Sequence, residues 1–288
     1  MAMRFQEELT SLQNPRVKQV VRWRNRPDRD DSQVVLAEGY RALVRALAGG
    51  YPLKEIFVCP ECFPPEKHHE EELLAQWAAR GARLIRVAPL PFEKMCYRDR
   101  PEGLLGVGPQ LHRGLEALKP AKNPFYLVAE QIEKPGNLGT IMRSSDAVGV
   151  DGLILCDSRT DLFNPNVVRA STGNLFTLPV AEATTRETIP WLKKKGVKIL
   201  ATSPHADPLY TQVDLTAPVA VAVGAEQYGL TKPWIEQADL VVRLPMMGEA
   251  DSLNVSTATS ILLYEVLRQR LDAGLLQDPG KVPDSADC

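Results

Sequence analysis

Residues 219–230 of this 288-residue chain read VAVAVGAEQYGL, an apolar run that ends in two glycines flanking one carboxylate. Five consecutive apolar residues bounded by glycine predict a strand that is buried on both faces, and such strands are typical of parallel sheets covered by helices. Ligands of open parallel sheets bind beyond the carboxyl ends of the strands. We therefore expect a binding site at Gly224, Glu226 and Gly229, because glycine allows close backbone approach and a carboxylate can bind hydroxyls or orient an arginine.

Short apolar runs alternate with amphipathic stretches on both sides of this segment, which predicts strands separated by helices. The predicted strands are 34–37, 56–58, 84–87, 104–107, 125–129, 153–155, 197–201 and 219–223, and the predicted helices are 40–48, 66–80, 138–148, 186–195 and 253–269. The alternation of strands and helices stops at residues 109–124, which contain three prolines and show no sustained hydrophobic period. We therefore predict a small α/β domain at 1–108, a linker at 109–123, an α/β domain with a parallel sheet at 124–272, and a tail at 273–288 with the composition of a disordered segment.

The overall charge excludes a protein that holds nucleic acid by bulk charge alone, since 34 lysines and arginines stand against 36 acidic residues. One local basic stretch departs from this balance. Between Asn14 and Arg26 there are five basic residues and no acid: Arg16, Lys18, Arg22, Arg24 and Arg26. Such a stretch is either the solvated face of a helix or a surface that contacts RNA phosphates, with Trp23 as a stacking platform.

Several other classes are disfavoured. No apolar run approaches the roughly 18 residues that span a bilayer, and two glutamates lie where a signal peptide needs apolar residues. Five cysteines, an odd number, fit reduced thiols, so we expect a cytoplasmic protein without membrane association. Cys59, Cys62, His68 and His69 could suggest zinc, but a second cysteine pair is absent and adjacent histidines rarely share one ion, so we expect no metal.

Two further polar segments adjoin predicted helices. Residues 130–143 read EQIEKPGNLGTIMR, with Asn137 as a plausible helix N-cap and Arg143 six residues beyond it. Residues 244–258 read LPMMGEADSLNVSTA, and their Ser, Asn and Thr residues are poor formers of helix interiors. A cap at Ser252 or Asp251 would explain one of these polar residues, so we expect a cap together with a binding site. No segment fits a Gly-x-Gly-x-x-Gly or Gly-Lys-Ser/Thr phosphate loop, which disfavours dinucleotide and NTP binding.

Three motifs emerge in order along the chain: Asn-x-Gly-x-x-x-Arg at 137–143, Gly-x-Glu-x-x-Gly-Leu at 224–230, and Pro-Met-x-Gly-x-x-x-Ser-Leu-Asn-Val-Ser at 245–256. In order and spacing they resemble the motifs of the SpoU (TrmH-like) RNA ribose 2'-O-methyltransferases of the SPOUT superfamily. The resemblance spans about 125–270. Residues 11–18 and the later Glu38-Gly39 are similar to the RNA-binding domain that many members carry ahead of the catalytic one.

The resemblance implies a deep trefoil knot in the C-terminal domain, S-adenosylmethionine bound in the knot, and a homodimer whose active site takes residues from both subunits. The implied catalytic residues are Asn137, Arg143, Glu226 and Asn254. The implied cofactor contacts are Gly224, Leu244, Met246, Ser252 and Leu253. The chain departs mildly from the family at 144–145, where two serines replace the Thr-Ala of many members.

The implied activity is methylation of a ribose 2'-hydroxyl in structured RNA, and we favour ribosomal RNA because the N-terminal part resembles that of rRNA-directed members. A tRNA methyltransferase and a noncatalytic RNA-binding ribosome-assembly protein remain as alternatives, while the added N-terminal domain disfavours a small-molecule methyltransferase. We expect Arg143 to activate the hydroxyl, either as a base or as a protonated group that stabilises alkoxide charge. The second role is favoured because a guanidinium stays protonated in proteins.

Overall fold

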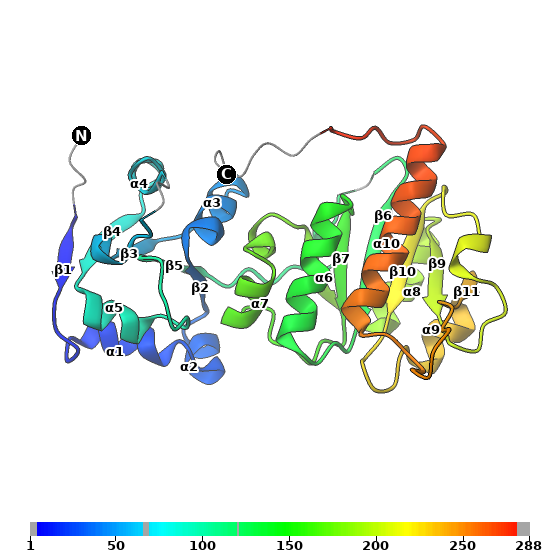
Figure 1. The fold of residues 1–288 in the computed structure, drawn as a ribbon, viewed down its shortest axis with the longest axis horizontal. Coiled ribbons are helices and arrows are strands. Elements are labelled where there is room, and N and C mark those ends of the chain that lie inside the picture. The colour runs from blue at the N-terminus through cyan, green and yellow to red at the C-terminus, as the bar shows by residue number, and fades with distance from the viewer. Residues whose placement is uncertain (1–4, 66–68, 120, 281–288) are drawn as a thin grey trace. The chain divides into compact units, whose positions relative to one another are not determined.

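The computed structural model describes residues 5–65, 69–119 and 121–280. Within these residues the chain forms two compact units, one from 5–111 together with 161–177 and the other from 112–160 together with 178–280. Each unit contains one sheet with helices packed on it (Figure 1). The predicted α/β class is therefore confirmed. Of the predicted tail at 273–288, residues 281–288 lie outside the described part of the chain.

The first unit contains a five-stranded mixed sheet. Strands β1, β4 and β3 are parallel, and β5 runs antiparallel to its neighbours β3 and β2. In spatial order the strands are β1 (Glu7–Leu9), β4 (Arg83–Val87), β3 (Glu55–Val58), β5 (Leu104–Pro109) and β2 (Val34–Glu38). The helices of this unit are α1 (Pro15–Arg22), α2 (Arg26–Asp31), α3 (Tyr40–Ala48), α4 (Glu70–Ala79), α5 (Pro89–Met95) and α7 (Pro165–Ala170).

Helix α1 begins where Asn14 caps it, since the Asn14 side chain accepts a hydrogen bond from the backbone N–H of Arg16 at 2.8 Å. The helix buries Val17 and Val20, and Trp23 follows at its end. The Trp23 ring is only 5% exposed within the core of this unit, and its Nε1 donates to Ser32 Oγ at 2.8 Å. The prediction that Trp23 provides a stacking platform for RNA is wrong, because the ring is buried.

The segment 161–177 packs within the first unit, although its neighbours in the chain belong to the second. A buried ion pair between Arg29 and Asp161 anchors its start. Gly173 has a left-handed φ of 86°, and a Cβ at this position would lie 2.9 Å from the Ala42 Cα, so the close approach requires glycine. The Tyr51 and Phe176 rings pack edge to face with centroids 4.8 Å apart. These contacts hold the segment against the first unit.

The second unit contains a six-stranded sheet in which every neighbouring pair is parallel, as the apolar run at 219–223 predicts. In spatial order the strands are β11 (Leu240–Val242), β9 (Lys198–Thr202), β10 (Val219–Val223), β6 (Phe125–Glu130), β7 (Gly152–Cys156) and β8 (Val180–Ala183). Its helices are α6 (Pro135–Ala147), α8 (Thr185–Lys194), α9 (Lys232–Gln237) and α10 (Val255–Asp272).

Helices cover both faces of this sheet. Alternate residues of β6 and β10, including Tyr126 and Ala220, share one core with Ile189 of α8 and Trp234 of α9. Helices α6 and α10 lie side by side, and α10 packs on β10 (Figure 1). The Oγ atoms of Ser144 on α6 and Ser260 on α10 lie 2.7 Å apart, which joins the two helices.

The structure also contains elements that the sequence pattern did not predict. The short strands β1, β8 and β11, and the helices α2, α5, α7 and α9, each have three to seven residues. Such lengths are too short to establish a period of 2.0 or 3.6 residues. Helix α4 begins at Glu70 rather than at 66, and residues 66–68 lie outside the described ranges. Among the helices of the described ranges, none is long and apolar enough to cross a membrane.

Candidate functional site

The three polar segments follow strands of the second unit and gather at the carboxyl edge of its parallel sheet. Strands β6 and β10 are neighbours, so the loops after Glu130 and Val223 are adjacent. Strand β11 is separated from β10 by β9. The chain after β11 must therefore cross the end of β9 to reach α10, which packs beside α6. This crossing brings the third segment over the first two.

Three of the four predicted catalytic residues are joined by hydrogen bonds at this edge. Asn137 Nδ2 donates to Glu226 Oε1 at 2.5 Å, and Asn254 Nδ2 donates to Asn137 Oδ1 at 3.2 Å. We call Asn137, Glu226 and Asn254 the polar triad. Asn137 is not the N-cap of its helix as predicted, because α6 begins two residues earlier at Pro135 and Lys134 precedes it. Its amide is thus free to bond Glu226 and Asn254.

Glu226 is held by several donors. Its Oε2 accepts from the Glu133 backbone N–H at 3.4 Å. Burial acts to raise the pKa of Glu226, but the hydrogen bonds from Asn137 and from backbone amides at 226, 133 and 134 outweigh it, and the pKa lies below its ordinary value. Glu226 therefore stays ionised at neutral pH. It connects the loop after β10 to the loop after β6.

Asn254 serves both as the N-cap of α10 and as a member of the polar triad. Its Oδ1 accepts from the Ser256 backbone N–H at 2.9 Å and from Ser256 Oγ at 2.6 Å. Its Nδ2 remains available for Asn137. The cap is therefore Asn254 rather than Ser252 or Asp251, and the dual role explains part of the density of polar residues at this helix start.

Gly224 marks a close backbone crossing. A Cβ at this position would lie 2.1 Å from the Gly229 carbonyl carbon and 2.2 Å from the Leu230 nitrogen. Only glycine allows this approach, since real Cβ atoms essentially never lie within 3.0 Å of a neighbour. The loop from Gly224 to Leu230 therefore folds back tightly on the end of β10.

Glu130, a residue that the sequence pattern does not mark as functional, holds the far end of this loop. Its side chain is 1% exposed and accepts from the Thr231 N–H at 2.7 Å, from Thr231 Oγ1 at 2.6 Å and from Thr185 Oγ1 at 3.0 Å. The sequence feature that could have indicated this role is its position, because Glu130 is a carboxylate directly after the apolar run 125–129. Its three donors satisfy the buried carboxylate and fix the residue that follows Leu230.

The predicted cofactor contacts other than Gly224 lie in the segment 244–253. Leu244 and Met246 are half-buried, while Ser252 and Leu253 are exposed. Within the described ranges, the backbone groups of 244–253 make no hydrogen bonds. Leu253 is 39% exposed and Met247 is 96% exposed. The segment thus presents free backbone donors and acceptors beside apolar side chains.

Arg143 is not joined to the polar triad. It lies six residues beyond Asn137 on α6, about 9 Å further along the helix axis. Its side chain is exposed, and no hydrogen bond or ion pair joins it to another residue of the described ranges. The structure therefore brings together Asn137, Glu226 and Asn254 and leaves Arg143 free on the surface of the same unit.

The predicted RNA contacts lie on and after α1 in the first unit. Arg16 is half-buried, forms an ion pair with Glu55, and lies 5.2 Å from the Trp23 ring centroid. Arg24 is also partly buried, and its Nη1 donates to the Lys94 carbonyl at 3.3 Å. Lys18 and Arg22 are exposed. Of the four predicted contacts, Arg16 and Arg24 are thus partly buried and bonded within the fold, and Lys18 and Arg22 face solvent.

Cys59 and Cys62 lie close together with their Sγ atoms 3.1 Å apart. Burial and the Cys62 thiol raise the pKa of Cys59 to about 12, so this thiol stays protonated. Within the described ranges no group of three or more His, Cys, Asp and Glu side chains could hold a metal ion. Of the two histidines considered with them, His69 lies 3.6 Å from a Glu72 carboxylate oxygen, and His68 lies outside those ranges.

Comparison with known proteins relates both units to RNA-modifying enzymes. Residues 124–264 match the SpoU rRNA Methylase family, and residues 14–106 match the MRM3-like substrate binding domain. A crystal structure of an RNA 2'-O ribose methyltransferase is 40% identical, with a TM-score of 0.79 over 92% of this chain and 99% of that one. An AdoMet-bound rRNA methyltransferase from Sinorhizobium meliloti is 33% identical, with a TM-score of 0.82 over 94% and 98%. The 23S rRNA (guanosine(2553)-2'-O)-methyltransferase RlmP of Bacillus subtilis (strain 168) is 28% identical over 90% of this chain and 99% of its own length.

Proposed function

This chain belongs to the SpoU rRNA methylase family, and we propose that it transfers a methyl group from S-adenosylmethionine to a ribose 2'-hydroxyl of ribosomal RNA. The relatives support this substrate, because solved structures and a curated relative across nearly the whole chain carry the names of rRNA methyltransferases. Residues 14–106 of the first unit match a substrate binding domain, which supports a role of this unit in binding that RNA.

The polar triad carries this proposal. Its residues come from three segments separated by about 30 to 90 positions, yet hydrogen bonds join them at the carboxyl edge of the sheet. The strand order also supports the trefoil knot, because the chain leaves β10, forms β11 two places away, and returns across the edge to Asn137.

The residues at this edge fit S-adenosylmethionine. Free backbone groups of 244–253 match the hydrogen-bonding edge of an adenine, and exposed Leu253 and half-buried Met246 match its apolar faces. The cofactor, when bound, supplies an electrophilic methyl group. The chain's own part is to hold these loops at fixed positions, which Glu226, Asn254 and the buried Glu130 accomplish.

Arg143 is the residue we assign to the ribose hydroxyl. Its guanidinium stays protonated, stabilises the alkoxide charge that develops on the 2'-oxygen, and binds the neighbouring phosphate, while the proton passes to phosphate or water. Arg143 is exposed and lies about 9 Å along α6 from Asn137. We infer that it acts in a homodimer, where it would complete the site of the partner subunit.

On the RNA side, exposed Lys18 and Arg22 remain candidates for phosphate contacts, with Arg24 beside them. An rRNA substrate also supports the predicted cytoplasmic location.

The test is methyl transfer from labelled S-adenosylmethionine to total RNA of a host that lacks the protein, with 2'-O-methyl sites mapped by their resistance to alkaline cleavage. Wild type is compared with Arg143→Ala and with Arg186→Ala, an exposed arginine on α8 at the opposite face of the sheet. We expect wild type and Arg186→Ala to methylate rRNA and Arg143→Ala to lose transfer while it still binds cofactor.

Methylation of tRNA alone would replace rRNA as the substrate. Cofactor binding without transfer to any RNA or to assembled ribosomal subunits, or neither binding nor transfer, would favour the noncatalytic RNA-binding alternative. Near-normal turnover of Arg143→Ala would refute the role given to this residue.

A further inference from the structure

Cys59 and Cys62 are a pair of nucleophilic side chains that the proposed function leaves unused. Cys59 directly follows β3, and the sequence Cys-Pro-Glu-Cys forms one 3₁₀ turn at the end of that strand. The Cys59 thiol donates a hydrogen bond to Cys62 Sγ at 3.1 Å. Two thiols this close can be oxidised to a disulfide, and the Cys-x-x-Cys spacing is typical of dithiols that react reversibly.

The backbone already holds the two cysteines at the spacing of a disulfide. The Cys62 N–H donates to the Cys59 carbonyl at 3.0 Å, which closes a turn whose first and last Cα atoms lie within about 7 Å. The Cys59 N–H donates to the Gly103 carbonyl at 2.8 Å, so the next strand fixes the start of the turn. Because the two sulfurs of a disulfide lie about 2.05 Å apart, the bond requires the Sγ atoms to approach by only about 1 Å.

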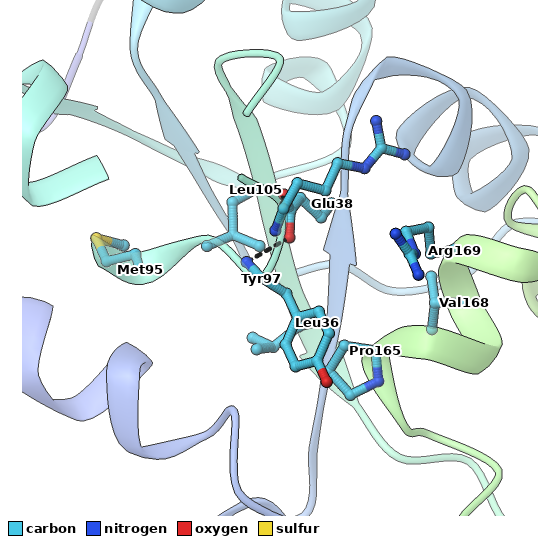
Figure 2. Close-up of a pocket in the computed structure, with 9 residues that line it drawn as sticks. Leu36, Glu38, Met95, Tyr97, Leu105, Pro165, Val168 and Arg169 are labelled. Atoms are coloured by element: carbon cyan, nitrogen blue, oxygen red, sulfur yellow. Dashed lines mark hydrogen bonds between the residues drawn. The ribbon is translucent and has the colours of Figure 1, made fainter. Parts of the chain in front are cut away.

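The two sulfurs differ in their access to solvent. The Cys59 side chain is 0% exposed and belongs to the core of the first unit. Leu36, Met95 and Leu105 of the same core are shown in Figure 2. Cys62 is only partly buried and packs against this core. A reagent in solution therefore reaches Cys62 first, and Cys59 lies behind it within bonding distance.

The surroundings of Cys59 give the two thiols different roles. Burial, followed by the Cys62 sulfur, raises the pKa of Cys59 to about 12, so Cys59 stays a thiol while Cys62 is unmodified. Cys62 is therefore the nucleophile of a first step. Once Cys62 carries a substituent, its sulfur is neutral and no longer contributes to the raised pKa of Cys59. The Glu61 carboxylate, whose Oε2 lies 3.6 Å from Cys59 Sγ, can then accept the Cys59 proton.

We propose that Cys59 and Cys62 form a reversible disulfide by exchange with low-molecular-weight disulfides such as glutathione disulfide. The Cys62 thiolate attacks one sulfur of the small disulfide, forms a mixed disulfide and releases one thiolate. Cys59 then loses its proton and attacks Cys62 Sγ, which forms the Cys59–Cys62 bond and releases the second small thiolate. Two protein thiols are oxidised, one small disulfide is reduced, and the two protons pass to the two released thiols.

This exchange fits a chain whose cysteines are reduced at rest, because disulfides in reducing compartments are usually transient. It involves neither S-adenosylmethionine nor RNA. The proposal therefore goes beyond the proposed function and is tested separately from it.

The experiment treats the full, reduced chain with glutathione and glutathione disulfide, quenches the reaction with acid, and blocks the remaining thiols with N-ethylmaleimide. Intact mass counts the blocked thiols among the five cysteines of the chain. Cleavage after Glu61 separates Cys59 from Cys62, so peptide masses identify which sulfurs are joined. The variants are Cys59→Ser and Cys62→Ser. The matched control is Cys96→Ala, which removes a buried cysteine of the same core.

We expect wild type and Cys96→Ala each to lose two blocked thiols and to gain the Cys59–Cys62 bond, with the mixed disulfide in less than about a tenth of the molecules. Cys59→Ser should stop at a stable mixed disulfide on Cys62, because the second nucleophile has been removed. Cys62→Ser should take up glutathione at Cys59 at least about tenfold more slowly, since Cys59 is buried. Dithiothreitol should restore all thiols.

A wild type that stops at the mixed disulfide, or whose Cys62 does not react, would overturn the proposal. A disulfide from Cys62 to Cys96, or one between two chains, would also overturn it. If Cys59→Ser fails to fold because its hydroxyl is buried, the peptide masses of wild type and the slow reaction of Cys62→Ser still decide between these outcomes.

Discussion

Replacing Gly224 with alanine tests whether the crossing after β10 is as tight as the structure places it. The added Cβ would lie 2.1 Å from the Gly229 carbonyl carbon, and ordinary contact begins near 3.4 Å, so the backbone must move by about 1.3 Å. No rotamer change relieves this contact, because the neighbouring atoms are backbone. Movement is opposed by Thr231, whose N–H and Oγ1 both donate to buried Glu130.

The magnitude follows from these contacts. Overpacking costs about 1–3 kcal/mol, and weakening a hydrogen bond to a buried carboxylate costs about 1.5–3 kcal/mol. We therefore expect Gly224→Ala to lose about 2.5–6 kcal/mol of unfolding free energy, which is on the order of 10 °C or more in the Tm of the second unit. Because the same loop lies at the proposed cofactor site, the affinity for S-adenosylmethionine should fall at least about tenfold.

The assay is thermal unfolding together with calorimetric titration of S-adenosylmethionine. The control is Gly248→Ala in the segment after β11, where a Cβ would meet nothing within 4 Å, so its Tm should match wild type. Gly229→Ala also meets no atom but has φ of 66°, which should cost about 1–2 kcal/mol from backbone strain alone. A Gly224→Ala protein that melts and binds cofactor like wild type would show that the crossing after β10 is not tight.

Three further outcomes are expected. Arg143→Ala should keep the wild-type Tm, because its side chain is exposed and makes no hydrogen bond within the described ranges, yet single-turnover methyl transfer should fall about 100-fold or more. Asn137→Ala should raise the pKa of Glu226, measurable by carbon-detected NMR titration. In wild type the lowered pKa contributes stability that is fully present above the ordinary pKa of about 4.5 and is lost as pH falls through the folded pKa, so in the variant this acid-labile contribution should be smaller; an unmoved titration would contradict this. Arg29→Met should lose about 3–5 kcal/mol in urea unfolding, and adding Asp161→Leu should restore most of it; equal losses in single and double variants would show that the two side chains are not paired.

Much of the second unit could be predicted from sequence. The strands at 125–130 and 219–223 were found because parallel strands buried on both faces are uniformly apolar, and this property is local. The motif loops were found because each directly follows such a strand. Helix α6 was placed three residues late, since Pro135 and Gly136 carry no apolar period, although proline is favoured at the first helical position.

The contacts of the candidate site could not be predicted from local sequence pattern. Asn254 reads as one polar residue among several, and its double role as cap and triad member depends on Asn137, 117 positions away. In the sequence Glu130 is only the start of a polar segment, because its donors Thr185 and Thr231 are 55 and 101 positions away. Hydrogen bonds between residues so far apart in the chain produce no periodic pattern in the sequence.

The class of fold and the order of the three motif loops could be predicted from sequence, because alternation of apolar and polar residues reports the burial of each element one at a time. The family followed from the resemblance of the three motifs. Long-range contacts in the fold establish which loops meet, that Trp23 is buried in the core, and that 161–177 packs with the first unit through Asp161 and Gly173. Burial and pairing of a side chain depend on residues brought close by the whole chain, and an amphipathic stretch has the same pattern whichever partner covers it.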